Sequence, residues 1–203
     1  MTGAVGEASA VAGTAAVILA AGAGRRLGGV AKALLLHRGR TYLENVAIAA
    51  RAVGLVDAVV VVGAPFGDVV AAHARQLGLR VRVNSAPERG MASSVALGFE
   101  AISAGPAAWA WLWPVDHPTV QASTLRALQS AIGDADVAQP RHAGRGGHPP
   151  LVARSWWSRL AACVDHADGA RGVLRAARSV AVDVDDPAVV RDVDTPADLE
   201  MSA

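Results

Sequence analysis

The sequence predicts an α/β fold in which helices cover both faces of a mainly parallel sheet. Apolar runs that are too short for helices recur between stretches of helical periodicity, a pattern typical of strands that alternate with helices. Some of these runs are apolar without interruption, as expected for strands that are buried on both faces. With 203 residues and 52% hydrophobic content, the chain can bury one substantial core, so we expect a single domain.

The domain is expected to begin after a disordered leader. Residues 1–14 are small and nearly uncharged, which leaves too little side chain to anchor a structure, so the domain is predicted over 15–203. A signal peptide would have basic residues before its apolar stretch, whereas Glu7 precedes the apolar stretch here. That stretch is better explained as a buried strand.

The predicted elements follow in chain order. The first strand covers residues 16–20 and runs into a glycine-rich turn. In the next helix, Thr41 and Glu44 have the spacing of a capping box, and Gly54 supplies the stop. The remaining elements are a strand over 59–62, a helix over 68–77, a strand over 80–84, a helix from 91 or 92, a strand over 107–113, a helix near 121–132, a strand near 136–138, a loop over 140–150, helices near 155–164 and 169–178, a strand over 180–184 and a final helix capped by Thr195.

Charge, cysteine content and hydropathy exclude several classes of partner. Lys plus Arg total 19 against 18 Asp plus Glu, so the net charge of +1 gives no global argument for nucleic acid or an anionic membrane. Cys163 is the one cysteine, so no intramolecular disulfide can form. No segment reaches the roughly 18 apolar residues of a membrane span. We expect a cytoplasmic protein with no nucleic-acid or membrane partner.

The turn after the first strand has the composition of a phosphate site. Residues 19–32 read LAAGAGRRLGGVAK. The glycines let the backbone approach a ligand and aim N–H groups at it, while Arg25, Arg26 and Lys32 add positive charge. These properties suit a polyphosphate; the alternative is a tight turn with solvated arginines.

Two familiar glycine-rich loops are disfavoured, because residues that each motif requires are missing here. A Walker loop has Ser or Thr directly after its lysine, but Lys32 precedes Ala33. A dinucleotide-binding fold has an acidic residue at the end of its second strand to hold a ribose, but the strand over 59–62 ends in Gly63. The turn is therefore interpreted as the grip for a nucleoside triphosphate.

Carboxylates at the ends of later elements predict a metal site. Asp116 stands just past the strand over 107–113, where a carboxylate can hold Mg²⁺ while waters and phosphate oxygens complete the octahedron; a loop cap is the alternative. A second carboxylate is expected from Asp192 or Asp194. We choose Asp192, because Asp194 can equally cap the final helix.

Two other groupings have simpler explanations. A zinc site of His117, His142 and His148 lacks short ligand spacing and a companion cysteine, so we reject it. Three tryptophans alternate along the strand over 107–113, which places them on one face of the strand. Core packing is the expected role of these three side chains.

Five motifs in order resemble one family. The turn over 19–32 is joined by NSAPERGMASS at 84–94, PVDHP at 114–118, GRGGHPPL at 144–151 and RDVDTPADL at 191–199. Together they resemble the MobA-like nucleotidyltransferases, and more closely the molybdenum cofactor cytidylyltransferase branch, which has LAAG where others have LAGG. PVDHP departs from the family's usual GDxP, with Val115 where glycine is common.

The resemblance implies a fold and a reaction. The fold would be a single Rossmann-like three-layer domain of the nucleotide-diphospho-sugar transferase type. The reaction would be Mg²⁺-dependent transfer of CMP from CTP to the terminal phosphate of the molybdopterin cofactor, with release of pyrophosphate, and a client molybdoenzyme could be a partner. Ala21 in place of a second glycine favours CTP on the resemblance alone.

The resemblance also implies roles for individual residues. Lys32 and Arg26 would stabilise charge on the α-phosphate and the leaving pyrophosphate, with Asp116 as the third catalytic residue. The loop that carries His148 would lie on the acceptor side. His117, judged by its own place beside Asp116, could donate to a substrate phosphate; an exposed loop histidine is the alternative. The metal would be held by Asp116 and Asp192. The nucleotide-binding set would be Leu19, Ala20, Ala21, Gly22, Gly24, Lys32, Asn84 and Gly90.

Three alternatives stay open. The same chemistry could use GTP, or a sugar or polyol phosphate as acceptor. A non-catalytic nucleotide-binding partner of molybdoenzyme maturation would have no need of a metal clamp, so Lys32, Asp116 and Asp192 together count against it. A dehydrogenase is weakened by the missing ribose carboxylate.

Overall fold

The computed structural model of the protein describes residues 13–24 and 28–192. The predicted leader lies outside this part of the chain except for residues 13 and 14, and β1 begins at Thr14. The predicted final helix, with Thr195 and Asp194, also lies outside it. Both the leader and the final helix stay predictions.

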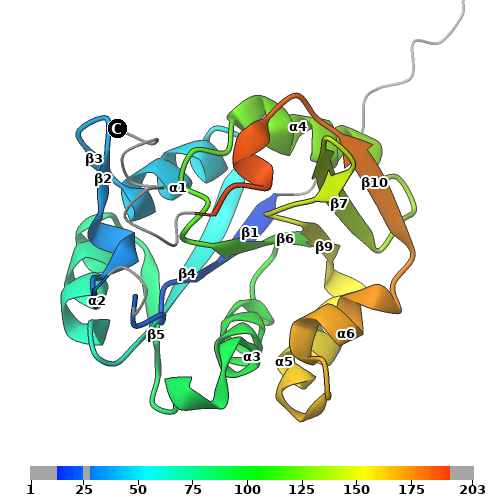
Figure 1. The fold of residues 1–203 in the computed structure, drawn as a ribbon. Helices are drawn as coiled ribbons and strands as arrows, with labels where there is room; N and C mark the ends of the chain where they lie inside the picture. The colour runs from blue at the N-terminus through cyan, green and yellow to red at the C-terminus, as the bar shows by residue number, and fades with distance from the viewer. Residues whose placement is uncertain (1–12, 25–27, 193–203) are drawn as a thin grey trace, which may run out of the picture.

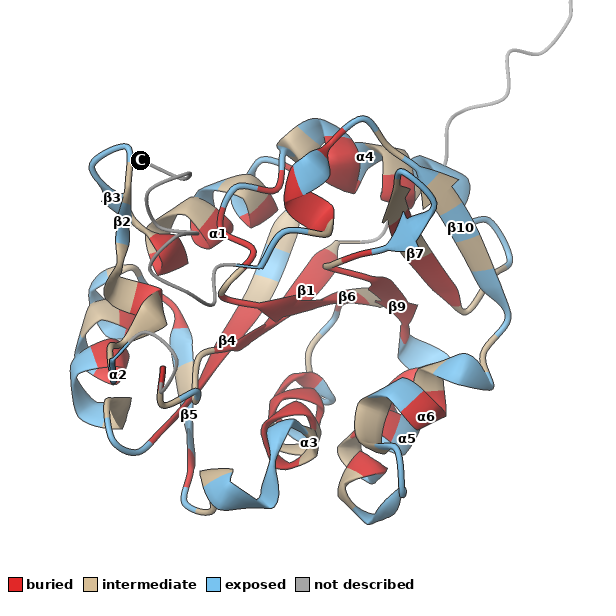
Figure 2. Ribbon diagram, viewed as in Figure 1, coloured by how far each residue is buried: buried red, intermediate tan, exposed pale blue. Residues whose placement is uncertain are grey.

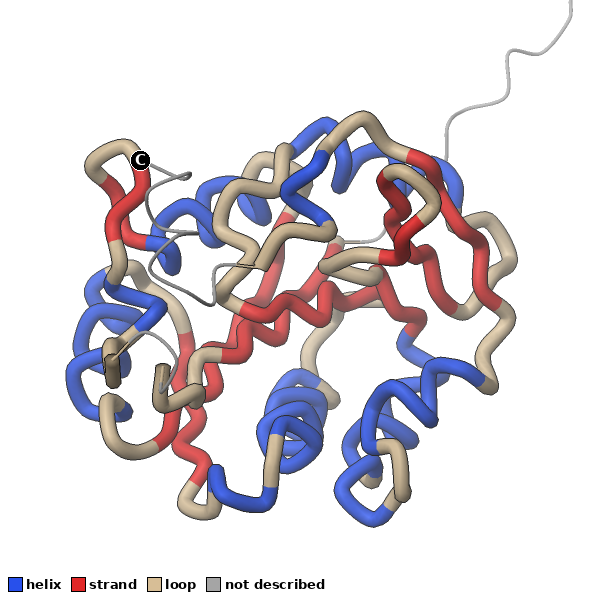
Figure 3. The backbone as a smooth tube through the Cα atoms, viewed as in Figure 1, coloured by secondary structure: helices blue, strands red, loops and turns tan. Residues whose placement is uncertain are grey.

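A twisted sheet forms the centre of the molecule, and its neighbouring strands are mostly parallel (Figures 1 and 3). Along the sheet the order is β10-β7-β9-β6-β1-β4-β5, with β8 paired to β7. β1 runs parallel to β4 and β6, β4 to β5, and β7 to β10, whereas β9 is antiparallel to both β6 and β7. The bounds are β1 Thr14–Leu19, β4 Leu55–Gly63, β5 Arg80–Asn84, β6 Trp109–Pro114, β7 Val137–His142, β8 Arg145–Gly146, β9 Leu151–Ala153 and β10 Ser179–Asp183.

Helices cover both faces of the sheet. α1, α2 and α4 pack on one face, and α3, α5 and α6 on the other (Figure 1). The bounds are α1 Tyr42–Arg51, α2 Gly67–Gln76, α3 Met91–Ile102, α4 Ala122–Ala131, α5 Trp157–Ala161 and α6 Gly169–Arg175. The predicted three-layer α/β class is confirmed. In the described residues, no helix combines the length and apolar content needed to cross a membrane.

The strands at the centre of the sheet are buried on both sides, as Figure 2 shows. In β1, Ala16 and Ile18 pack toward α1 and α4, while Val17 and Leu19 pack toward α3. This alternation follows from the period of two along a strand. It explains why such strands read as continuous apolar runs in the sequence.

Local predictions at the first helix and at the tryptophans are confirmed. Thr41 Oγ1 accepts from Glu44 N at 3.1 Å, and Glu44 Oε2 accepts from Thr41 N at 2.6 Å, which completes the capping box. Trp111 and Trp113 are fully buried, and Trp109 packs against the same apolar cluster. The tryptophans on this strand serve the core.

The prediction of one loop over 140–150 is wrong. β7 continues through Pro140 to His142 and pairs with β8 across a turn at Ala143 and Gly144. Pro140 lacks an N–H, but its carbonyl accepts from Gly147 N at 2.8 Å, so it still takes part in the hairpin.

Short elements account for the other differences. A two-stranded hairpin, β2 Leu36–His37 and β3 Arg40–Thr41, precedes α1 and was not predicted. The single helix expected over 155–164 is divided into η4 Arg154–Trp156, α5 and η5 Cys163–Asp165. Further single turns of 3₁₀ helix are η2 Lys32–Leu34, η3 Pro87–Arg89 and η6 Pro187–Val189.

Candidate functional site

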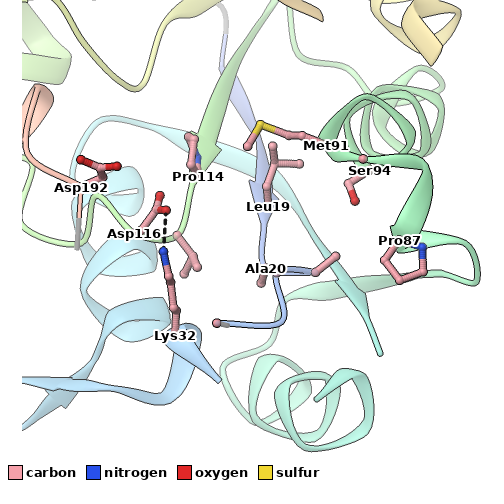
Figure 4. A pocket seen from close by; sticks show the side chains of 14 residues that line it. Leu19, Ala20, Lys32, Pro87, Met91, Ser94, Pro114, Asp116 and Asp192 are labelled. Atoms are coloured by element: carbon pink, nitrogen blue, oxygen red, sulfur yellow. Dashed lines mark hydrogen bonds and ion pairs between the residues drawn. The ribbon is translucent and has the colours of Figure 1, made fainter. Parts of the chain in front are cut away.

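A pocket of about 530 Å³ opens beyond the carboxyl ends of β1 and β6. In parallel α/β sheets, this is the edge at which ligands bind. Figure 4 shows the pocket from close by. The described residues that line it are Leu19, Ala20, Ala21, Gly22, Gly24, Lys32, Pro87, Gly90, Met91, Ser94, Pro114, Val115, Asp116 and Asp192.

An ion pair crosses one side of this pocket. Lys32 Nζ lies 3.2 Å from Asp116 Oδ2, and the side chains are only 15% and 24% exposed (Figure 4). Lys32 and Asp116 are 84 residues apart in the sequence, so they come together only in the folded chain. Val115 N donates to Leu19 O at 3.1 Å, which ties the loop carrying Asp116 to the end of β1. Partial burial reduces solvent screening of the pair.

Asp192 lines the pocket on the same side as Asp116 (Figure 4). Two carboxylates are hard oxygen ligands of the kind that Mg²⁺ and Mn²⁺ take. Within the described residues, no group of three or more His, Cys, Asp or Glu side chains could hold a metal ion unaided. The donor set therefore fits a divalent cation whose remaining ligands are waters and phosphate oxygens.

The glycine-rich turn brings backbone, with little side chain, to the pocket. Gly24 has φ of 57°, and a Cβ at this position would lie 2.1 Å from Val30 O, so the turn requires glycine here. Gly29 N donates to Gly24 O at 3.0 Å and closes the turn. The predicted residues Arg25 and Arg26 lie outside the described residues.

The opposite side of the pocket is built by η3 and the start of α3. Pro87, Gly90, Met91 and Ser94 line it, and Gly90 has φ of 89°. Sequence reasoning singled out this segment but could not tell which of its side chains face the pocket, because Ser93 and Ser94 differ only by their angle on the helix.

Asn84 lies behind this wall. It is 3% exposed and does not line the pocket. Asn84 Nδ2 donates to Ser93 Oγ at 2.8 Å and to Ser94 Oγ at 2.9 Å, and Asn84 Oδ1 accepts from Ala86 N at 3.0 Å. In this structure Asn84 positions Ser94 and the η3 loop.

The two predicted acceptor histidines lie together outside the pocket lining. Their rings are 5.1 Å apart between centroids. His117 is buried with Nδ1 3.0 Å from Ala188 O, and His148 N donates to Val189 O at 2.7 Å. A Cβ at Gly147 would lie 2.3 Å from Val189 O, so the chain before His148 is pressed against η6.

His148 has an unusual environment. Its Nδ1 is buried and has no hydrogen-bond partner among the described residues. Burial, with a smaller contribution from the neighbouring His117, lowers the pKa of His148 to about 4 in spite of the opposing effects of Asp116 and Asp192. His148 is therefore neutral near pH 7, when it can donate or accept a hydrogen bond without adding charge.

The fold and this pocket define a nucleotide-transferase type of α/β domain. The chain matches the MobA-like NTP transferase domain over residues 16–182 and belongs to that family. The resemblance seen in its five motifs is confirmed.

Individual relatives of the chain carry different names. The chain is 33% identical over 189 residues to a protein named nicotine blue oxidoreductase from Paenarthrobacter nicotinovorans, covering 88% of this chain and 91% of the relative. A crystal structure of Rv0371c from Mycobacterium tuberculosis in complex with manganese has a TM-score of 0.67 and 26% identity, covering 93% of this chain and 97% of that one. A nucleotidyl transferase from Methanothermobacter has a TM-score of 0.76 and 22% identity, covering 93% and 95%.

Proposed function

We propose that this protein transfers CMP from CTP to the terminal phosphate of the molybdopterin cofactor and releases pyrophosphate, in the cytoplasm. The observation that carries the proposal is the Lys32–Asp116 ion pair in a pocket that Asp192 also lines, at the carboxyl edge of the sheet. Family membership supports nucleotidyl transfer as the reaction class.

The reaction brings anions together, so most of the catalytic task is charge neutralisation and alignment. An oxygen of the acceptor phosphate attacks the α-phosphorus of CTP and forms a new P–O bond. The bond from the α-phosphorus to the oxygen that bridges to the β-phosphorus breaks, and pyrophosphate leaves with that electron pair. Lys32 is proposed to balance the charge that develops on the leaving group, with Arg26 as a second cation.

The glycine turn and the opposite wall are proposed to hold the rest of the nucleotide. Gly22 and Gly24 line the pocket without side chains, so a phosphate can approach the backbone closely. Ala21 also lines it and is the residue on which the preference for CTP over GTP rests, through the family likeness. His117 and His148, behind Asp116, are proposed to mark the acceptor side.

Asp116 and Asp192 are proposed to hold Mg²⁺. When bound, such a cation would polarise the phosphate oxygens and offset their negative charge. The manganese in the Rv0371c structure supports a divalent cation in this fold. Chelation with EDTA should abolish pyrophosphate release, and added Mg²⁺ should restore it; full activity in EDTA would contradict a metal role.

The proposal is tested by crossing a panel of nucleoside triphosphates with a panel of acceptors and measuring pyrophosphate. We expect release from CTP with Mg²⁺ only when active molybdopterin is supplied. Release with a sugar or polyol phosphate, or from GTP, would reassign the substrate while keeping the reaction class. No release from any combination would overturn nucleotidyl transfer.

A second candidate is an oxidoreductase, favoured by the name of the relative at 33% identity. The end of β4 argues against a dinucleotide ligand whose ribose is held by an acidic side chain. Gly63 stands where an acidic residue would hold the ribose, and a Cβ there would lie 3.2 Å from the Ala21 Cβ and 3.3 Å from the Pro87 Cβ. Tight binding and oxidation of NAD(P)H, without triphosphate binding, would favour this candidate over ours.

A further inference from the structure

A second pocket, of about 590 Å³, lies outside the catalytic pocket and shares no lining residue with it. Its walls are the β2–β3 hairpin, one side of α1, the residues that follow His117, and η6 with Arg191. Figure 1 shows this hairpin beside α1 at one end of the molecule. Side chains without charge, including Ile48, Ala49 and Pro118, contribute the apolar part of the lining.

Arginines from two distant parts of the sequence meet at this pocket. Arg38 and Arg40 come from the hairpin, and Arg191 comes from the last described segment. All three are exposed, and none makes an ion pair with a carboxylate in the part of the chain that the structure describes. His37 lines the same pocket. Positive charges gathered without a partner repel one another, and an anion would relieve that repulsion.

The acidic side chains nearby are already engaged. Asp186 is the one acidic residue among the described lining residues, and it is 2% exposed. Its Oδ2 accepts from Gln121 N at 3.0 Å and Thr124 Oγ1 at 2.7 Å, and its Oδ1 accepts from Ala188 N at 3.1 Å. Asp186 therefore holds the pocket wall together and, within the described ranges, forms no ion pair with the arginines.

Among the described residues, Glu44 is a further carboxylate close to the hairpin, and the helix cap uses it. The backbone N–H of Thr41 holds the pKa of the Glu44 carboxyl below its usual value, with smaller effects from other groups, of which Arg40 is the last. The 2.6 Å bond from Thr41 N fixes this carboxylate at the start of α1. Arg40 thus interacts electrostatically with Glu44 without forming an ion pair with it.

The hairpin presents Arg38 at a conformationally costly position. Arg38 and Gly39 form the turn with φ of 51° and 77°, where Asn, Asp or Gly is usually preferred at the first position. The left-handed conformation is unfavourable for a residue that carries a Cβ. Asn45 Nδ2 lies 3.5 Å from both His37 O and Arg40 O, which holds the turn against α1. A functional use for the guanidinium would explain an arginine there.

We propose that this arginine pocket, defined by Arg38, Arg40 and Arg191, binds a small phosphate-bearing anion. Guanidinium groups form paired, charge-assisted hydrogen bonds with phosphate oxygens, and three of them around one cavity suit a ligand with more than one negative charge. Two lining residues of this pocket are close in sequence to the candidate metal ligands: Pro118 is two residues from Asp116, and Arg191 adjoins Asp192.

Calorimetric titration of the full chain with inorganic pyrophosphate tests this proposal. Pyrophosphate can also enter the catalytic pocket, so the titration is done in a Lys32→Ala background that weakens that site. We expect one site to remain. Adding Arg40→Gln and Arg191→Gln should raise its Kd at least about tenfold. Adding Arg82→Gln, an exposed arginine on β5 away from the pocket, should leave the Kd unchanged.

A second variant separates binding from folding. Arg38→Asn suits the left-handed turn better than arginine, so we expect an unchanged or higher Tm together with weaker pyrophosphate binding. Equal binding by the Arg40/Arg191 and Arg82 variants, or no remaining site, would overturn the proposal. Tighter binding of citrate than of pyrophosphate would overturn phosphate as the ligand chemistry. Because the readout is binding alone, the result does not depend on which nucleotide the catalytic pocket uses.

Discussion

The two walls of the candidate nucleotide pocket differ in charge. The charged wall carries Lys32, Asp116 and Asp192, whereas the uncharged wall, formed by Pro87, Gly90, Met91 and Ser94, has no ionisable side chain (Figure 4). The charged wall is held by an ion pair between distant segments, and the uncharged wall by the hydrogen bonds of Asn84. We infer that phosphates and metal meet the first wall and that base and sugar meet the second.

This division makes different kinetic predictions for the two walls. A change on the charged wall should lower kcat, because it removes stabilisation of charge that develops during the reaction. A change behind the uncharged wall should mainly raise KM, because it removes binding that is equal before and during the reaction. Three variants test the contrast, from the largest expected effect to the smallest.

Asp116→Asn should have the largest effect. It removes a proposed metal ligand and the charge that pairs with Lys32, so we expect kcat to fall on the order of 10²–10³-fold. Steady-state pyrophosphate release with varied Mg²⁺ measures the change. Asp183→Asn is a matched control, since that carboxylate on β10 is 81% exposed and does not line the pocket. Unchanged turnover in Asp116→Asn would remove this residue from the metal site.

Lys32→Ala should lower kcat about 10²-fold, because the leaving pyrophosphate loses a cation. Lys32→Arg keeps the charge in a bulkier, forked form and should recover part of the rate. A rise in KM with unchanged kcat would assign Lys32 to ground-state binding and would contradict the proposed contrast between the walls.

Lys32 is also the one lysine of the chain, which allows a direct test of its position. Amine acylation followed by mass spectrometry can report on this side chain, with the N-terminal amine as an internal reference. CTP with Mg²⁺ should protect Lys32 from acylation if the phosphates lie against it. Equal labelling with and without the nucleotide would contradict that placement.

Asn84→Ala should have the smallest kinetic effect. Ser93 and Ser94 lose a buried donor, so we expect KM for CTP to rise on the order of 3–10-fold, kcat to change little, and unfolding free energy to fall by about 1–3 kcal/mol. Gln129→Ala is the control, because Gln129 Nε2 donates to Val53 O at 2.9 Å outside the pocket. A drop in kcat specific to Asn84→Ala would place the uncharged wall in the chemical step.

The sequence predicted the architecture well where local signals and the global fold agree. Continuous apolar runs became central strands, and the capping box of Thr41 and Glu44 formed as expected. The strands of two residues were missed, because β2, β3 and β8 are defined by cross-strand hydrogen bonds more than by their own composition. The predicted loop over 140–150 began too early, because Pro140 can stay in β7 with only its carbonyl in a hydrogen bond.

The sequence predicted which residues line the candidate site better than it predicted how these residues contact one another. Nine of the residues predicted from sequence line the pocket, namely Leu19, Ala20, Ala21, Gly22, Gly24, Lys32, Gly90, Asp116 and Asp192. The direct contact between Lys32 and Asp116 depends on the pairing of β1 with β6, which the sequence pattern does not specify. The place of Asn84 behind the wall depends on which way a side chain turns at the end of β5.

The Lys32–Asp116 ion pair has a consequence for the order in which ligands are taken up. A cation that binds Asp116 would release the ammonium of Lys32 for a phosphate, and a triphosphate that binds Lys32 would release the carboxylate for a cation. Each ligand would then raise the affinity of the other by the same factor, because thermodynamic coupling is reciprocal. The ion pair would thus make the pocket select the metal–triphosphate complex over either component alone.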